Sequence, residues 1–385
     1  MTAKSTTFSL TFLMCALVFG LLLMNRNTAS ASFAVKAQGD KPVEQTRKNI
    51  QVLNGLPESQ LFPLMNFVAT SLGVKCDYCH VKEGKNAQGE DNWIWDRDDK
   101  PKKLIGRRMM KMVLDINRAN FDSETLVTCY TCHHGSTVPG RLPPLPPQDP
   151  IRTATATLPT AEQILDKYIA AVGGKDAATK FKTTVMKGTI ERAEGRNADE
   201  TLNKRERPLE ITLKDADKAL ITWATAQGST TAGLNAESGW IKTNAGSRKL
   251  SGRDLESLKR AAAYYRVIKV VAQPAQMKVL GTEKIGERET YVVGVVVDPN
   301  TTTKFFFDTQ TGFLLRALTT TRTILVPLPD QVDFEDYRDV DGVKVPFTIR
   351  VSDAAPFSTS TRRFTEIRHN VAVDDNIFNL TATAP

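Results

Sequence analysis

Two copies of a five-residue motif constrain this chain more than any other feature of its sequence. They are Cys76-Asp77-Tyr78-Cys79-His80 and Cys129-Tyr130-Thr131-Cys132-His133, so each has the form C-x-x-C-H. Two thiols three residues apart on one turn can each form a thioether bond with a haem vinyl group, and the adjacent histidine can then bind the iron. The motifs therefore predict two covalently bound c-type haems on these four cysteines, with His80 and His133 as proximal ligands.

A four-thiolate zinc site is the main alternative for the four cysteines. Zinc ribbons usually separate two cysteine pairs by about 15–20 residues, whereas 49 residues, 80–128, lie between the two pairs in this chain. A zinc site would also leave both trailing histidines without a role. No βαβ pattern that would suit a thioredoxin-like redox pair surrounds either motif, so the sequence favours haem.

The N-terminus has the pattern of a secretory signal peptide, which we place at residues 1–31. Lys4 precedes an apolar run of 17 residues, Phe8–Met24, and Ala29-Ser30-Ala31 provides an A-x-A cleavage site. Because this length is the lower limit for a membrane span, an uncleaved segment that anchors the protein in a membrane is the alternative. Covalent haem attachment takes place outside the cytoplasm, so we expect the protein in the periplasm or cell envelope.

A proline-rich segment predicts the boundary between two domains. Residues 139–159 contain seven prolines, a density typical of an extended spacer: Pro139, Pro143, Pro144, Pro146, Pro147, Pro150 and Pro159. All four motif cysteines precede this linker, and Thr/Val-rich segments follow it. We therefore expect a mostly α-helical dihaem domain at residues 40–138 and a β-rich domain at residues 160–385.

Each motif of the first domain follows a segment with helical periodicity and a methionine in its apolar stripe. Leu61, Met65, Val68 and Leu72 form the first stripe, which ends at Gly73, and Ile105, Met109, Met112 and Ile116 form the second. A helix followed by a haem motif therefore occurs twice, which indicates an internal repeat with one unit for each haem.

Methionines are the candidates for the sixth iron ligands, because thioether sulfur suits haem iron. His134 adjoins His133 and cannot reach the far face of the same haem. Met65 precedes the first motif, so we assign it to the first haem. For the second haem, Met109 and Met112 share one helix face and both stay open, whereas Met110 points about 100° away from Met109.

The second domain has the pattern of an α+β fold with an antiparallel sheet. Thr160 and Gln163 form a capping box for a helix that ends at Val172, and a second helix is expected at Asp254–Arg266. Short β-type runs separated by turn residues predict strands at Val185–Ile190, Leu209–Leu213, Ala219–Thr225, Trp240–Thr243, Tyr291–Val297, Lys304–Phe307, Phe313–Thr319, Val343–Val351 and Ser360–His369.

The haem segments carry a resemblance to a known family. Leu64–His80 and Arg107–Gly135 each resemble a haem unit of the photosynthetic reaction-centre cytochrome c subunit, and the resemblance covers roughly residues 40–140. In that family each haem packs along a helix whose methionine is usually the sixth ligand, which implies Met65 and Met109, with Met112 as the alternate. Family members carry four haems, whereas this chain has two motifs, so the resemblance implies a dihaem relative.

The second domain resembles the half-barrel domains of lipoprotein-sorting carriers of the bacterial envelope. Its strand-rich pattern and the hairpin Phe306-Phe307-Asp308 to Thr311-Gly312 carry this resemblance. It implies a half-barrel-like sheet and an apolar ligand or an envelope partner for this domain.

Composition and motifs together indicate an exported dihaem electron carrier that serves redox partner proteins and is not an enzyme. The formal net charge of +8 falls to +6 without Lys4 and Arg26 of the signal peptide, and four haem propionates lower it to about +2. Nucleic-acid binding is therefore not expected. Two alternatives remain: a peroxidase-like haem enzyme with one open iron site, and an envelope binding protein whose β domain binds an apolar ligand or partner.

Overall fold

The computed structural model describes residues 40–85, 91–140, 158–178, 180–196, 201–226, 228–265 and 276–380. The described residues from Asp40 on form one compact unit. The predicted signal peptide and residues 141–157 of the predicted linker lie outside the described residues. No helix within the described ranges is both long enough and apolar enough to span a membrane.

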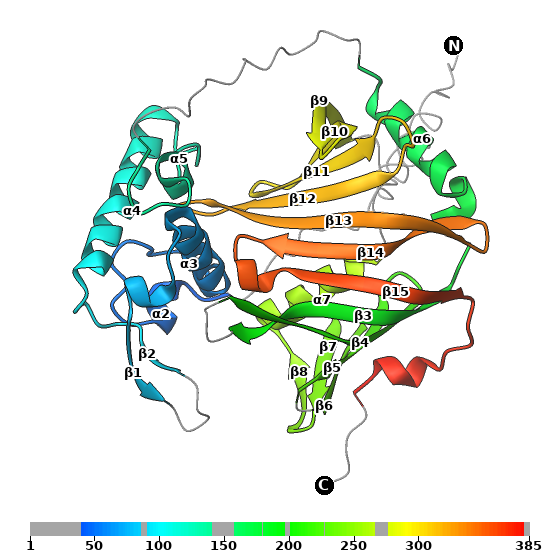
Figure 1. Ribbon diagram of the computed structural model, residues 1–385, viewed down its shortest axis with the longest axis horizontal. Coiled ribbons are helices and arrows are strands. Elements are labelled where there is room, and N and C mark those ends of the chain that lie inside the picture. Colours follow the sequence, from blue (N-terminus) through cyan, green and yellow to red (C-terminus); the bar gives the residue numbers. More distant parts are fainter. Residues whose placement is uncertain are drawn as a thin grey trace, which may run out of the picture. The chain divides into compact units, whose positions relative to one another are not determined.

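The part of the chain that carries the motifs is mostly helical, as predicted (Figure 1). Its elements are α2 (Val43–Thr46), α3 (Glu58–Leu72), the 3-10 turn η1 (Cys76–Tyr78), β1 (Val81–Lys85), β2 (Asp91–Ile94), α4 (Pro101–Asn120) and α5 (Cys129–His133). The antiparallel hairpin of β1 and β2 is an addition that the prediction of a mostly helical domain did not include. Its strands are short and mostly polar, so they lack the alternation of apolar and polar residues that predicts a strand.

Helices α3 and α4 begin and end where the local sequence requires. Gly73 adopts φ +66° directly after α3, and the N–H of Val74 closes the last turn on the carbonyl of Ala69 at 3.0 Å. A left-handed residue at this position is the usual end of a helix, and glycine adopts it without steric cost. Pro101 opens α4, where its missing N–H removes no helical hydrogen bond.

The rest of the described chain is built on one antiparallel sheet, which confirms the predicted fold class (Figure 1). Its strands are β3 (Thr183–Arg196), β4 (Leu202–Lys214), β5 (Lys218–Thr225), β6 (Gly228–Asn235), β7 (Ser238–Thr243), β8 (Gly246–Leu250), β9 (Met277–Ile285), β10 (Arg288–Asp298), β11 (Thr301–Asp308), β12 (Leu314–Arg322), β13 (Pro327–Val340), β14 (Val343–Asp353) and β15 (Ser360–His369). The order β8-β7-β6-β5-β4-β3-β15-β14-β13-β12-β11-β10-β9 consists of two meanders of consecutive strands joined where β3 pairs with β15.

Two longer helices pack against this sheet, α6 (Ala161–Val172) and α7 (Gly252–Tyr264), and they match the two predicted helices. The capping box at the start of α6 is present, since Thr160 Oγ1 accepts from the N–H of Gln163 at 3.2 Å and Gln163 Oε1 accepts from the N–H of Thr160 at 2.9 Å. Short 3-10 turns complete the fold at η2 (Lys175–Ala178), η4 (Pro356–Ser358) and η5 (Asp375–Phe378).

The described residues contain two hydrophobic cores. The larger one lies between the sheet and helices α6 and α7, and Tyr168, Phe307, Phe334 and Ile349 are among its fully buried side chains. The smaller core lies among α2, α3 and α4 and buries Val43, Leu53, Leu56, Leu64 and Val113. Leu325 and Val326, from the connection between β12 and β13, belong to this smaller core as well.

Candidate haem-binding site

The first C-x-x-C-H motif forms a single tight turn. The N–H groups of Cys79 and His80 both donate to the carbonyl of Cys76, at 3.2 and 2.9 Å. Residues three apart lie on the same side of such a turn, so the two thiols face one region of space. Cys76 is exposed and Cys79 is half-buried, and both thiols are unpaired.

The second motif forms the short helix α5, which is capped by the residue before the motif and by one residue inside it. Thr128 and Thr131 form a capping box, in which each hydroxyl accepts from the backbone N–H of the other residue. Cys129 is half-buried and Cys132 is exposed, so each motif has one exposed and one half-buried unpaired thiol, in opposite order. His134 ends the helix at φ +48°, exposed to solvent, with its ring 5.3 Å from the ring of Tyr130.

His133 has the hydrogen bond that an iron-binding histidine requires. Its Nδ1 lies 2.8 Å from the carbonyl oxygen of Ser136. Because a carbonyl can only accept, Nδ1 carries the proton and Nε2 is left with a free lone pair. Histidines that bind metals usually donate the other ring N–H to such an acceptor, which fixes the tautomer and the orientation of the ring.

His80 lies in an aromatic environment instead. Its ring centroid is 5.1 Å from Trp95, which stacks on Trp93 at 4.8 Å and meets the edge of Phe62 at 5.8 Å. Its Nδ1 is buried and has no hydrogen-bond partner among the described residues. Burial is the main cause that lowers the pKa of His80, and the nearby charge of Lys103 lowers it further, so both favour the neutral imidazole. The neutral ring is the form that binds a metal.

The four cysteines do not assemble a zinc site. All four are described, and within the described ranges no group of three or more His, Cys, Asp or Glu side chains is placed to hold a metal ion. Burial raises the pKa of the Cys76, Cys79 and Cys129 thiols. The thiol turns and the orientation of His133 fit a c-type haem at each motif.

The apolar stripe predicted for the second helix does not face the protein core. In α4 the buried face is formed by Val113 and Asn117, with Met110 and Leu114 partly buried against the smaller core. Ile105, Met109 and Met112 of the predicted stripe are 38, 39 and 43 % exposed. Apolar side chains in a contiguous exposed stripe usually mark a surface that another group covers.

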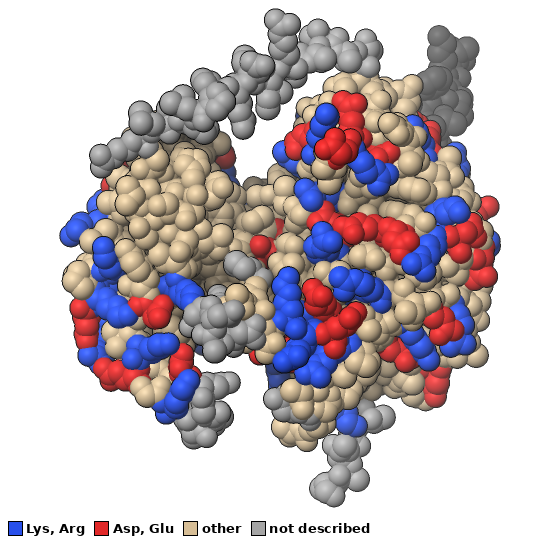
Figure 2. All heavy atoms as spheres, in the orientation of Figure 1, with Lys and Arg blue, Asp and Glu red and all other residues tan. Residues whose placement is uncertain are grey.

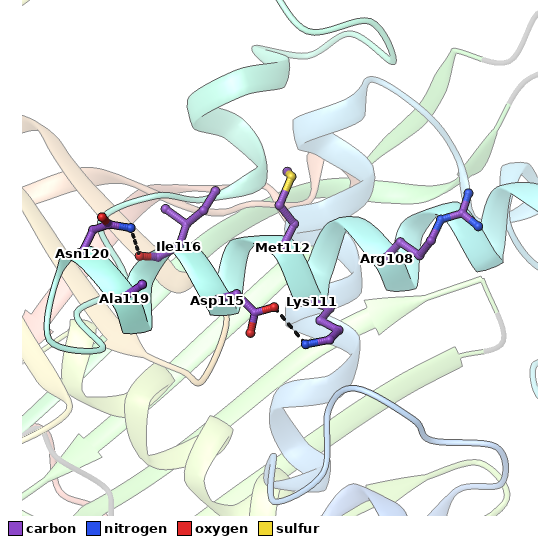
Figure 3. Close-up of a pocket in the computed structure, with 7 residues that line it drawn as sticks. All are labelled: Arg108, Lys111, Met112, Asp115, Ile116, Ala119 and Asn120. Atoms are coloured by element: carbon purple, nitrogen blue, oxygen red, sulfur yellow. Dashed lines mark hydrogen bonds and ion pairs between the residues drawn. The ribbon is translucent and has the colours of Figure 1, made fainter.

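A surface cavity of about 490 Å³ lies along this part of α4, and Met112 is among its lining residues. The other residues that line it are Arg108, Lys111, Asp115, Ile116, Ala119 and Asn120. Figure 3 shows Met112 and Ile116 projecting from one side of α4, while the ion pair between Lys111 and Asp115, 2.9 Å long, lies on another side. This hollow is largely open to solvent.

The structure separates the three methionines of α4 into two groups. Met109 and Met112 are exposed on the stripe, whereas Met110 packs into the smaller core. Met65 of α3 is partly buried against the same core. Met109 and Met112 therefore stay as candidates for the second haem, and Met65 stays the candidate for the first because it is the one methionine of the helix before the first motif. Packing against the smaller core is common to Met65 and Met110 and does not distinguish them.

The two haem segments are locked together through the end of α3. The N–H of Gly135, two residues after His133, donates to the carbonyl of Ser71 at 2.9 Å. The backbones approach so closely here that a Cβ atom on Gly73 would lie 2.1 Å from the carbonyl oxygen of Gly135. The helix that precedes the first motif therefore holds the segment that follows the second.

This contact predicts a large difference between two glycine substitutions. Gly73 and Gly84 both have φ +66°, but a Cβ on Gly84 meets nothing within 4 Å. We expect Gly84→Ala to cost about 1–2 kcal/mol for the left-handed backbone alone, and Gly73→Ala to cost about 2–5 kcal/mol because of the added clash. Urea unfolding of the two variants, followed by circular dichroism, measures both values. Equal free energies of unfolding would show that the contact between α3 and Gly135 is unimportant.

Several residues that support the site carry no strong sequence signal. Asn117 is 4 % exposed and holds the segment before the second motif, since its amide donates to the carbonyl of Val127 at 2.8 Å and accepts from the N–H of Val127 at 2.9 Å. Its place on the buried face of α4, four residues after Val113, is the one hint of this role. The contact of Trp95 with His80 depends on the β1–β2 hairpin, which was not predicted.

Comparisons with known proteins agree with these motifs. Residues 21–174 match the family model described as photosynthetic reaction centre cytochrome C subunit, which confirms the resemblance of the haem segments. The photosynthetic reaction center cytochrome c subunits of Thermochromatium tepidum and Roseobacter denitrificans are 33 and 30 % identical over 126 and 111 residues. Cytochrome c-554 of Chloroflexus aurantiacus is 32 % identical over 95 residues.

These relatives match only part of this chain. The two reaction-centre subunits match 28 and 27 % of it, and the matched segment spans 28 % of each relative. The matches with cytochrome c-554 cover 23 % of this chain and 20 % of the relative. The two C-x-x-C-H motifs thus belong to a region similar to c-type cytochromes.

Solved structures resemble more than half of this chain, a larger share than the cytochrome relatives match. A DUF1329 family protein from Desulfovibrio piger covers 57 % of this chain and 97 % of its own, with 14 % identity and a TM-score of 0.40. A LolA superfamily protein from Nitrosomonas europaea covers 58 % of this chain and 98 % of its own, with 13 % identity and a TM-score of 0.39.

Proposed function

We propose that this protein is an exported dihaem c-type cytochrome that transfers electrons between redox partner proteins in the cell envelope. Cys76 and Cys79 hold one haem and Cys129 and Cys132 hold the other, through thioether bonds. His80 with Met65, and His133 with Met109, ligate the two irons, and Met112 is the alternate for the second. When bound, each haem supplies a one-electron iron couple.

The exposed apolar stripe of α4 is the observation that carries this proposal. Its two methionines lie on a helix that leads to the second motif, and the described polypeptide leaves them 39 and 43 % exposed. Fully burying an exposed side chain of this size stabilises a protein by about 1.5–3 kcal/mol, so covering the exposed part of each methionine would contribute roughly 1 kcal/mol. A haem attached at α5 and packed along this helix would cover the stripe, as haems do in the family that residues 21–174 resemble.

The protein's own residues would keep both irons closed to other ligands. The carbonyl of Ser136 orients His133, the packing of Trp95 limits the motion of His80, and Asn117 fixes the segment before α5. As iron ligands, the methionines would leave no coordination position free for oxygen or peroxide. This arrangement suits electron transfer, in which the coordination of the iron stays constant, and the family resemblance points to electron carriers in the same way.

Export is supported by the N-terminal signal pattern and by the haem motifs, which receive their haem outside the cytoplasm. Redox partner proteins follow from the carrier function. The β domain is proposed to be a module of the cell envelope. The larger core fills its inner face, where Phe305, Phe307 and Phe334 lie between the sheet and its helices.

The spin state of the iron and the reaction with peroxide test the carrier function against a peroxidase-like one. The holoprotein, exported in a host that attaches haem c, is expected to be low-spin at both irons, because histidine and methionine saturate each of them. Its peroxide turnover is then expected to be slow. Met65→Ala serves as the positive control, since it should create one high-spin iron that reacts with peroxide. A high-spin signal with rapid peroxide turnover in the unmodified protein would favour the peroxidase-like alternative.

A further inference from the structure

The connection between β12 and β13 has an unusual composition for the turn of a β-hairpin. Residues 322–326, here called the β12–β13 tip, read Arg-Thr-Ile-Leu-Val and are mostly apolar. Hairpin turns normally lie on the surface and consist of polar residues and glycine. Leu325 and Val326 are both 0 % exposed, so this tip is inserted into other parts of the protein.

The tip is buried in the smaller core, to which both helices that precede the haem motifs contribute. Leu325 and Val326 share that core with Leu64 of α3 and Val113 of α4. Met65 follows Leu64 in the chain, and Met112 precedes Val113. The tip therefore shares its core with residues directly next to two candidate axial ligands.

Hydrogen bonds make the tip rigid. The Thr323 hydroxyl donates to the carbonyl of Val326 at 2.7 Å and accepts from the N–H groups of Leu325 and Val326 at 3.2 and 3.0 Å. The N–H of Thr323 also donates to the carbonyl of Val326, at 3.1 Å. A side chain that satisfies the backbone of its own turn fixes that turn in one conformation.

Polar contacts hold the tip, and a second part of the β domain, against the haem segments. The Arg322 guanidinium forms an ion pair with Glu124 at 2.8 Å and donates to the carbonyl of Ser123 at 2.5 Å. Both residues lie in the connection between α4 and the second motif. Thr70, near the end of α3, donates from its hydroxyl to the carbonyl of Ala354, which follows β14, at 2.6 Å.

We propose that the β12–β13 tip is a positioning element of the haem site: it sets the spacing of α3 and α4 and thereby aligns their methionines with the irons. This inference rests on the proposed function. Close-packed cores do not deform smoothly, so the loss of a wedge between two helices moves the helices or loosens them. Either response weakens a bond between methionine and iron. The β domain is then a structural part of the haem site.

Truncation of the buried Leu325 side chain of the tip tests this inference in the full-length holoprotein. Leu325→Ala should keep both haems, because their thioether bonds do not depend on helix spacing. It should weaken the methionine–iron charge-transfer band in the far red, lower a midpoint potential, and bind imidazole on the order of five times more tightly or better than the unmodified protein. Ile324→Ala is the matched control, since Ile324 lies in the same turn but is 39 % exposed, and it should change none of these properties.

The outcomes separate this inference from the proposed function. If the unmodified protein shows the charge-transfer band and Leu325→Ala leaves the band, the potentials and the imidazole affinity unchanged, the positioning role is wrong and the carrier function stands. If the unmodified protein lacks the band, the methionine ligands are wrong, and so is this inference. If Leu325→Ala is not recovered as folded protein, Val326→Ala removes fewer buried atoms from the tip and is judged by the same measurements.

Discussion

Met109→Ala is expected to open the second haem iron while it leaves the first haem unchanged. The variant should gain a high-spin signal, bind imidazole at one iron, and show a lower midpoint potential for that haem, because methionine ligation raises the potential. Optical titration with imidazole and a redox titration measure these changes. Met65→Ala should produce the same changes at the first haem.

Neighbouring methionines of α4 supply the controls for this experiment. Met110 packs into the protein core, so Met110→Ala should cost about 2 kcal/mol of stability and leave both irons six-coordinate. Met112 lies on the same exposed face as Met109, and it becomes the assigned ligand if Met112→Ala opens the iron and Met109→Ala does not. If neither substitution opens an iron, methionine ligation by α4 is wrong.

Replacing Cys129 and Cys132 together with alanine should remove one haem and leave the other. The first motif forms its own turn, and its hydrogen bonds involve none of these residues. We therefore expect the haem content of the exported protein to fall by half, in a pyridine-haemochrome assay normalised to protein mass. Cys15→Ala is the matched control, because Cys15 lies in the predicted signal peptide and its loss should leave the haem content of the mature protein unchanged. A variant that retains two haems would show that attachment does not use the second motif.

The sequence predicted the local elements well where one strong pattern governed them. Three such features depend on residues only a few positions apart and can be recognised directly in the sequence. They are the C-x-x-C-H motifs, the capping box at Thr160 and the helix end at Gly73. The strand β13 was not predicted, because Pro327 and Pro329 usually exclude a central strand. Both prolines pair only with β12, since the pairing of β13 with β14 begins at Asp330. β13 is an edge strand at that end.

The periodicity of the sequence did not predict which face of α4 packs against the protein core. A stripe at Ile105, Met109 and Met112 normally faces a protein core, but here the core lies on the side of Val113. Sequence patterns show which face of a helix is apolar, and they do not show whether protein or another group covers it. The insertion of Leu325 and Val326 beside Leu64 likewise joins residues more than 250 positions apart, so no local pattern contains it.

The charged surface gives no sign of the site either. Figure 2 shows acidic and basic side chains interspersed over the sheet, whereas much of the surface at the upper left is uncharged. Net charge is therefore a poor guide to this protein, and the uncharged stripe along α4 is the informative surface.

The mass of the exported protein tests the central claim most directly. After expression in a host that attaches haem c, intact-mass spectrometry following extraction with acid and organic solvent should give the polypeptide plus two haems, because thioether bonds survive this treatment. The Cys129→Ala, Cys132→Ala double variant should give the polypeptide plus one. A polypeptide mass with no added haem, together with zinc that a chelator removes, would contradict the account.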